Sequence, residues 1–279
     1  MNSEKYHEFS AAIAGVDSDV DLFGAAMVIA ALGGHDADPH RAAFQLDLIA
    51  EAVRDHAGER ASPEALAHAI DHQLFSVQGF RGNTEEYADP QNSYLDRVID
   101  RRLGIPITLS VVYMEVAERV GLHCEGIGYP GHFVVRCNGA EDPMYIDPFQ
   151  QGVRLDRTEL LAGLNSLNLG GANPASFLAA VTRRQILQRM LNNLHVIFRE
   201  QRDLERWFDV IELLLRLEPW NATLVGERGM LNYRLGRLEQ AMDDLERYVS
   251  AGEPRESNPG ALRLLDELRL RYGGREELR

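Results

Sequence analysis

The chain is 279 residues long, 45% of them apolar, and its formal net charge is −14 at pH 7. Its length suits one large domain or two smaller ones with a buried core. No apolar run reaches the roughly 18 residues that span a bilayer, and the negative charge argues against nucleic acid and anionic membranes as partners. The N-terminus lacks the basic and apolar regions of a secretory signal, so we expect a cytoplasmic protein.

The first third of the chain has the pattern of helices. Helices are predicted over 20–32, 40–56 and 62–75. The third begins with Ser62, a favoured N-cap residue, followed by Pro63 in the first turn. A turn-rich loop over 80–92 and a short helix over 94–103 follow, and Gly104 is suited to end that helix. No catalytic chemistry is visible in this third.

A central helix is predicted to begin at Pro106, because proline suits the first helical turn. Apolar side chains follow it at helical spacing on one face. They are Leu109, Val112, Tyr113, Val116, Ala117 and Val120. Ile107, Val111 and Met114 widen this apolar face, so we expect the helix to lie in the middle of the core, and Gly121 to end it.

After Cys124 the pattern changes from helix to strand. Residues 132–137 and 144–147 predict two strands joined by a hairpin loop. If the loop is 138–141, the residue numbers of each cross-strand pair add to 279, and His132 lies directly opposite Asp147. Opposed residues share a sheet face at about 5 Å between Cβ atoms. A slip of one residue would separate the two side chains.

The chain is predicted to be helical again from Ala175 to its end, with a repeat of 35 positions. Val210, Leu213, Leu214, Glu218 and Pro219 recur as Leu245, Tyr248, Val249, Glu253 and Pro254. Gly229, Gly236, Ala241 and Pro254 fit the tetratricopeptide (TPR) pattern, whose period is about 34 residues. We therefore expect one domain over 1–174 and TPR-like helical hairpins over 175–279, with a capping helix over 261–272.

Several motifs in this order resemble the bacterial SirB-type proteins, which carry a transglutaminase-like core followed by tetratricopeptide repeats; the same core occurs in a eukaryotic F-box protein. The motifs are Asn92-Ser93-Tyr94-Leu95, Arg102-x-Gly104-Ile105-Pro106-Ile107-Thr108-Leu109-Ser110, Tyr129-Pro130-Gly131-His132-Phe133 and Ile146-Asp147-Pro148-Phe149. The resemblance covers nearly the whole chain. It implies an α+β, mostly helical fold: a papain- or transglutaminase-like core with a small antiparallel sheet, then TPR-like hairpins.

The resemblance also implies that His132 and Asp147 correspond to a catalytic histidine and its orienting acid. It does not imply catalysis, because active relatives carry a cysteine at the head of the buried helix, where the helix dipole lowers its pKa. Here Thr108 and Ser110 occupy that turn. Either hydroxyl could be a nucleophile with His132 as its base, or could bond local backbone groups instead.

The remaining candidate residues allow both a functional and a structural interpretation. Cleft positions are predicted for Asn92, Arg101, Pro106 and Tyr129. Asn92 could lend an amide to the site, or could belong only to a turn beside Pro90. His132 is either a retained site residue or a buried, hydrogen-bonded histidine. The sequence leaves open whether Phe80, Tyr87 or Phe149 fills the cleft.

Cofactor and metal sites are not predicted. There is no phosphate loop, and the glycines of 126–131 are not followed by a helix as in a dinucleotide fingerprint. His123, Cys124, His132 and Cys137 do not have the spacing of a zinc site. Two cysteines do not make a disulfide framework, and we expect both to be small buried hydrophobes.

Two functions from different classes remain. The first is a non-catalytic scaffold that binds a protein partner through the cleft and the TPR-like repeats, since stacked helix pairs form concave binding surfaces. The second is an amide or ester hydrolase or acyltransferase that uses Thr108 or Ser110 with His132 and Asp147. Catalysis requires a hydroxyl that is open to the cleft and within hydrogen-bond reach of the imidazole. A third possibility is a cleft that binds a small ligand unchanged.

Overall fold

The computed structural model describes residues 2–167, 170, 173–251 and 259–272. The chain divides into two compact units. We call Ala11–Met190 the core unit, and Met1–Ser10 together with Leu191–Arg279 the repeat unit. The division falls inside two helices, between Ser10 and Ala11 and between Met190 and Leu191. The expected domain boundary at 174/175 stays a prediction. Among the described helices, none combines the length and the apolar character that a membrane crossing needs.

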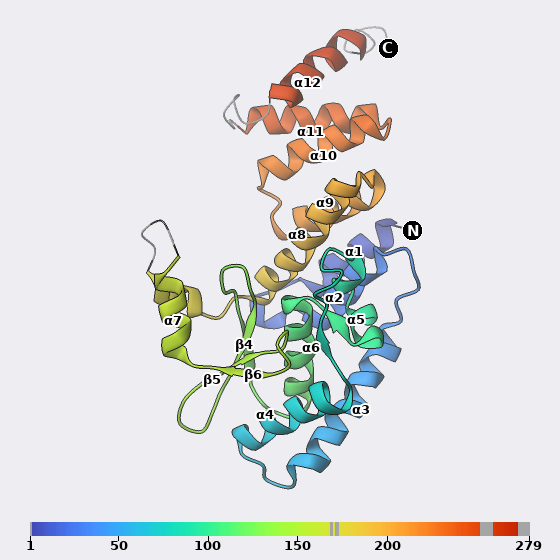
Figure 1. Ribbon diagram of the computed structural model, residues 1–279. Coiled ribbons are helices and arrows are strands. Elements are labelled where there is room, and N and C mark those ends of the chain that lie inside the picture. The colour runs from blue at the N-terminus through green and yellow to red at the C-terminus, as the bar shows by residue number, and fades with distance from the viewer. Residues whose placement is uncertain (1, 168–169, 171–172, 252–258, 273–279) are drawn as a thin grey trace. The chain divides into compact units, whose positions relative to one another are not determined.

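Helices make up most of the core unit (Figure 1). They are α2 (Leu22–Ala31), α3 (Pro39–Ala57), α4 (Pro63–Asp71), α5 (Leu95–Arg101), α6 (Pro106–Arg119) and α7 (Arg157–Asn165), with the first turns of α8 (Arg183–Gln201). The predicted start of α4 is confirmed, because the Ser62 side chain accepts a hydrogen bond from the N–H of Ala65 and Pro63 follows it. Residues 72–77 then continue α4 as a π-helical turn.

The end of α5 differs from the prediction. The helix stops at Arg101, and Arg102 rather than Gly104 takes the left-handed conformation, with φ 60°. Gly104 instead lies in the short strand β2 (Leu103–Gly104), which pairs with β1 (Arg81–Gly82) in parallel. A Cβ atom at Gly104 would come within 2.9 Å of the Thr108 hydroxyl and 3.0 Å of Val98. Glycine is therefore needed here for close packing against the head of α6. The C-cap of α5 is Arg102.

The four-stranded antiparallel sheet of the core unit has the strand order β3-β4-β5-β6. Its strands are β3 (Cys124–Ile127), β4 (Val134–Cys137), β5 (Met144–Asp147) and β6 (Val153–Leu155). Helix α6 lies beside this sheet and α7 on the sheet's other side (Figure 1). Leu160 and Leu164 of α7 pack with Ile127, Val134 and Tyr145 in one buried cluster. The predicted central helix is confirmed: eleven of the fourteen residues of α6 are buried.

The register of the β4–β5 hairpin corrects the prediction by two residues. Val135 pairs with Ile146 and Cys137 with Met144, so each pair adds to 281 and not 279. The loop is longer than expected because residues 142 and 143 belong to it. A shift of two keeps every side chain on its face of the sheet, whereas a shift of one would reverse them. His132 lies just before β4, outside the strand.

The two cysteines are a second correction. Cys124 and Cys137 are joined by a disulfide, with 4.0 Å between their Cα atoms. The expectation that both serve as small buried hydrophobes is therefore wrong, although Cys137 is fully buried. The cause is the pairing of β3 with β4, which sets Cys124 directly opposite Cys137. A sequence separation of 13 residues gives no sign of this until the strands are in register.

The repeat unit contains α1 (Asn2–Ala12) in part, the rest of α8, α9 (Leu204–Leu217), α10 (Ala222–Arg234), α11 (Leu238–Ser250) and α12 (Pro259–Tyr272). Helices α10 and α11 form the predicted hairpin. A Cβ atom at Gly229 would lie 3.0 Å from Leu245, and one at Gly226 would lie 2.8 Å from Tyr248. Small residues thus let the two helices approach. The predicted motif positions Glu253 and Pro254 lie outside the described residues.

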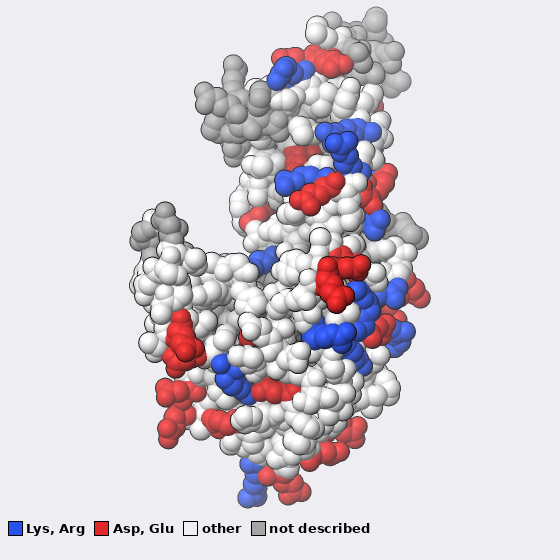
Figure 2. Space-filling view, viewed as in Figure 1, with Lys and Arg blue, Asp and Glu red and all other residues white. Residues whose placement is uncertain are grey.

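Charged side chains of both signs are interspersed on the face drawn in Figure 2, and Lys and Arg form no continuous basic stripe there.

A carboxyl group ties α4 to α6 and to β6 in the core unit. Asp71 accepts a hydrogen bond of 3.1 Å from the hydroxyl of Tyr113 and one of 2.6 Å from the guanidinium of Arg154. Burial nevertheless raises the pKa of Asp71 to about 6, and Arg154 and Tyr113 offset this only in part. The native state therefore holds a proton that the unfolded chain has already released at pH 5.

This pKa predicts a pH-dependent contribution to stability. Because the pKa of Asp71 is raised in the native state, its contribution is present below about pH 4 and is lost as the pH rises through about 6. We expect the free energy of unfolding of the wild type minus that of Asp71→Asn to fall by up to about 3 kcal/mol over this interval. Urea unfolding at stepped pH measures it, and a constant or rising difference would contradict the assignment.

Candidate functional site

His132 and Asp147 form a hydrogen-bonded pair. The imidazole Nε2 lies 2.7 Å from Oδ2 of Asp147. The carboxylate is 1% exposed, whereas the histidine side chain is 25% exposed. A carboxylate only accepts, so Nε2 carries the proton in this bond and Nδ1 remains the basic nitrogen of the neutral ring. The structure thus brings these two predicted residues together in the arrangement of an orienting acid and its base.

Asp147 is held in place by the turn that follows β5. Its Oδ1 accepts the backbone N–H groups of Phe149 and Gln150 at 3.0 and 3.2 Å. Its Oδ2 also accepts the side-chain amide of Gln150 at 3.0 Å. The Asp147-Pro148 sequence therefore both forms a turn at the end of the strand and supports the histidine. The carboxylate of Asp147 can be buried here because each of its oxygens accepts hydrogen bonds.

His132 is placed by the tight turn before β4. Its N–H donates to the carbonyl of Tyr129 at 3.0 Å, and Gly131 has a φ of 72°, a conformation that favours glycine. The guanidinium of Arg189 donates to the carbonyl oxygen of His132 at 2.9 Å. Both backbone groups of His132 are thus fixed, and its ring is fixed by Asp147. The imidazole is therefore pre-oriented without any ligand.

The head of α6 carries the two candidate hydroxyls, and both are completely buried. Thr108 Oγ1 accepts the N–H of Ile105 at 3.1 Å and lies 2.7 Å from the carbonyl oxygen of Asn92, to which it donates. Ser110 Oγ has no hydrogen-bond partner among the described residues. Neither hydroxyl bonds His132. Thr108 follows the local-bonding alternative, because it caps the helix with its side chain.

Both cysteines of the chain are used in the β3–β4 disulfide, so neither offers a thiolate. Cys124 begins β3 and Cys137 ends β4, away from the first turn of α6. A thiolate is the form of cysteine that attacks a carbonyl carbon. The chemistry of a papain-like site, in which a thiolate faces the imidazole, has no sulfur to perform it here.

The four predicted cleft residues have structural contacts. Asn92 is buried and its amide donates to the carbonyls of Glu86 and Tyr87, which closes the loop before it. Arg101 pairs with Asp89 at 2.9 Å in the same loop. Pro106 starts α6. The Tyr129 hydroxyl donates to the carbonyl of Leu160 at 3.3 Å. That these residues line a cleft stays a prediction.

One aromatic ring contacts the imidazole directly, and a second ring contacts the first. Phe149 stands edge-on to His132, with 5.9 Å between ring centroids, and Tyr87 stands edge-on to Phe149 at 6.4 Å. A Cβ atom at Gly82 would lie 2.4 Å from the Phe149 ring, so the ring rests on bare backbone. Phe80, in contrast, is buried beneath Arg102. Of the three rings that could fill the cleft, Phe149 contacts His132, and Tyr87 contacts Phe149.

Sequence reasoning gave no role to Gln150 and Arg189. Gln150 follows the Asp-Pro-Phe motif directly, so its proximity to Asp147 could have been inferred from the turn. Arg189 is 57 residues from His132 in sequence. Its side chain reaches the site only because α8 begins beside the sheet, which the pattern of apolar residues does not reveal.

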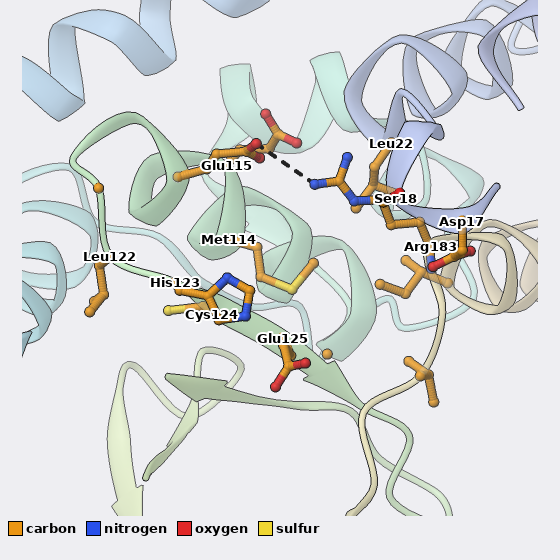
Figure 3. Close-up of a pocket in the computed structure, with 15 residues that line it drawn as sticks. Asp17, Ser18, Leu22, Met114, Glu115, Leu122, His123, Cys124, Glu125 and Arg183 are labelled. Carbon is orange, nitrogen blue, oxygen red and sulfur yellow. Dashed lines mark hydrogen bonds and ion pairs between the residues drawn. The ribbon is translucent and has the colours of Figure 1, made fainter. Parts of the chain in front are cut away.

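A hollow of about 540 Å³ lies elsewhere in the core unit, and Figure 3 shows it between α6, β3 and the start of α8. Its carboxylates all have partners in the protein. Asp17 accepts the backbone N–H of Arg183, Glu115 pairs with Arg119, Glu118 pairs with Arg183, and Glu125 pairs with Arg136. This hollow therefore has no unmatched charge that would select a ligand.

Comparison with known families identifies the class of this protein. Residues 40–192 match the family described as the transglutaminase-like superfamily, and 194–268 match a tetratricopeptide repeat. The chain belongs to the transglutaminase-like superfamily and carries tetratricopeptide repeats after that domain. The fold class expected from the sequence is confirmed.

Individual relatives show how far the likeness extends. A UPF0162 protein of Xylella fastidiosa is 34% identical over 238 residues, which cover 84% of each chain. A UPF0162 protein of Pseudomonas aeruginosa is 32% identical over 179 residues, covering 62% of this chain and 63% of the relative. Mouse F-box only protein 21 is 31% identical over 179 residues, 60% of this chain but 28% of that protein. No solved structure matches the chain significantly.

The buried hydroxyls give a paired prediction about the head of α6. Thr108→Val keeps the shape but leaves the Asn92 carbonyl and the Ile105 N–H without their partner, so we expect a loss of about 1–3 kcal/mol in the free energy of unfolding. Ser110→Ala removes a hydroxyl that has no partner, so we expect no loss, or a gain. Urea unfolding of both variants tests this; equal losses would contradict the assigned roles.

Proposed function

We propose that this protein is a SirB-type, non-catalytic member of the transglutaminase-like superfamily that acts as a protein-interaction scaffold. It binds its partner through the surface around His132 and through the TPR-like repeats. One observation carries the proposal: an oriented His–Asp pair stands in the core unit, while the helix that should supply its nucleophile has only sealed hydroxyls at its head.

A hydroxyl group has two requirements for attack on an acyl group. A serine or threonine oxygen must lose its proton to an adjacent base and must reach the substrate. The Thr108 hydroxyl donates its hydrogen bond to the carbonyl of Asn92, and Ser110 is 0% exposed. Exposing either would require the first turn of α6 to open, with the loss of the contacts around Gly104. Such opening is costly for a helix in the middle of the core.

The repeat unit supports the binding half of the proposal. A hollow of about 900 Å³ is lined by side chains from α9, α10, α11 and α12. Arg228 stiffens it, because its guanidinium bonds Glu212 and Asp244 at 2.6–2.8 Å. Asn232 lines the same hollow, is 3% exposed, and its side-chain amide donates to Asp244 at 3.1 Å. A concavity held by these ion pairs is suited to bind a segment of a partner protein.

The alternative is a hydrolase or acyltransferase that uses Thr108 or Ser110 with His132 and Asp147. What favours it is the intact, partly exposed imidazole, whose Nδ1 is free to act as a base in the geometry described. It requires one of the sealed hydroxyls to become accessible, which the scaffold proposal does not.

The scaffold proposal predicts that both units contribute to partner capture. Tagged wild type, His132→Ala and Arg247→Glu are incubated with a lysate of the source cells, and captured proteins are identified by mass spectrometry. Arg247 is chosen because it is 61% exposed and lines the repeat hollow. Arg199→Glu makes the same charge change at an exposed position of α8 outside that hollow and is the matched control.

We expect at least one protein that wild type and Arg199→Glu capture in equal amounts, and that each of the other two variants loses at least about tenfold. A tenfold loss corresponds to about 1.4 kcal/mol, which one interfacial contact can supply. Capture that is the same for all four proteins, or no capture by the wild type, would contradict the scaffold role.

A further inference from the structure

The side chain of Arg189 lies at the edge of the His132 surface. One guanidinium nitrogen donates to the carbonyl of His132 at 2.9 Å, and the guanidinium carbon lies 5.2 Å from the centre of the Phe133 ring. A Cβ atom at residue 128 would lie 2.7 Å from the other terminal nitrogen, so Gly128 leaves room for it. The backbone, the ring and the glycine together fix the orientation of the guanidinium.

Arg189 has no carboxylate partner among the described residues; Arg102 shares this feature, but its guanidinium donates to the Ile99 carbonyl and to Gln78. Other arginines of the core unit do pair with carboxylates. Arg119 pairs with Glu115 and Asp47, Arg136 with Glu125, and Arg154 with Asp71. Burial lowers the pKa of Arg189, and the group that opposes this is the Tyr87 hydroxyl. The chain has a net charge of −14, yet this half-buried cation has no anion beside it. Burial of an unpaired charge costs free energy, and a bound anion would offset that cost.

The groups around Arg189 indicate which kind of anion could bind there. Tyr87 is 53% exposed and carries a hydroxyl; His132 is partly exposed; and Phe149 stands between their rings. The surface therefore offers a guanidinium fork, a hydroxyl and an imidazole beside an aromatic edge. A carboxylate can accept from the guanidinium N–H groups that the His132 carbonyl does not use. A phosphate dianion fits worse, because one cation faces it and the carboxylate of Asp147 lies behind the imidazole.

We propose that Arg189, with Tyr87 and His132, forms a carboxylate-binding site that recognises a carboxyl group next to an apolar side chain on a peptide of the protein partner. We call these three residues the Arg189 site. The inference rests on the proposed function, since it names the chemistry by which the core unit would hold its partner. The carboxyl group belongs either to a peptide C-terminus or to an acidic side chain, and the test separates the two.

The test uses three small probes and the full chain. N-acetyl-phenylalanine has a terminal carboxylate, N-acetyl-phenylalanine amide lacks it, and N-acetyl-glutamate amide has a side-chain carboxylate only. Binding is followed by NMR as saturable shifts of the Arg189 Nε–H and the His132 ring nitrogens. We expect one or both carboxylate probes to shift these signals, and the amide probe to bind at least about tenfold more weakly, as a lost charge-assisted bond predicts.

Variants assign the binding to the site. Arg189→Gln should weaken the carboxylate probe at least about tenfold, Arg189→Lys should give an intermediate value, and Tyr87→Phe, at an exposed position that does not threaten folding, should weaken it about two- to fivefold. Arg157→Gln removes the same charge from an exposed position of α7 and should change nothing. Equal binding of the acid and the amide, or full binding by both Arg189→Gln and Tyr87→Phe, would overturn the inference.

These experiments separate failure of the Arg189 site from failure of the proposed scaffold role. If partner capture depends on His132 but no carboxylate probe binds, the Arg189 site is wrong and the scaffold role stands. If the probes bind and the amide bond of N-acetyl-phenylalanine amide is also cleaved, the non-catalytic role is wrong and the site stands.

Discussion

The buried carboxylate of Asp147 is the constraint on which the site depends. It accepts two backbone N–H groups from the turn after β5, an amide from Gln150 and the imidazole N–H of His132. Without the carboxylate, the turn and the histidine would lose their common partner. An anion can be kept out of water at this position because each oxygen has more than one donor. The His132–Asp147 pair therefore stabilises the local structure, and this role does not depend on a nucleophile.

The side chains at the head of α6 also have structural roles, at the position where the family chemistry would require a reactive group. Thr108 caps the helix and closes the chain on the loop that ends at Asn92, and Gly104 makes the room for that contact. A side chain in this role cannot also be presented to a substrate. The first turn of the helix is therefore committed to folding, and what remains accessible nearby is an oriented imidazole with an arginine, a tyrosine and a phenylalanine around it. Such a surface is equipped for recognition.

Much of this could be predicted from the sequence. The helices, the two hairpin strands and the His132–Asp147 pair followed from spacing and from the family resemblance. The predicted position of His132 directly opposite Asp147 in the ladder was wrong, because His132 lies in the turn before β4; the two side chains meet through a hydrogen bond from that turn. The disulfide was missed because it depends on which residues of β3 and β4 face each other, and cysteine count alone does not tell. Arg189 was missed because only the packing of α8 brings it to the site. The end of α5 was misplaced because a glycine can serve close packing as well as a helix cap.

The central claim, that an imidazole–carboxylate pair is retained here without an attacking group, is tested most directly by turnover of an activated amide. Hydrolysis of N-acetyl-phenylalanine p-nitroanilide by the full chain is compared with that by His132→Ala at equal concentration. The account predicts the same background rate for both proteins. A rate in the wild type that exceeds that of His132→Ala by about a hundredfold, the size of a general-base contribution, would contradict it.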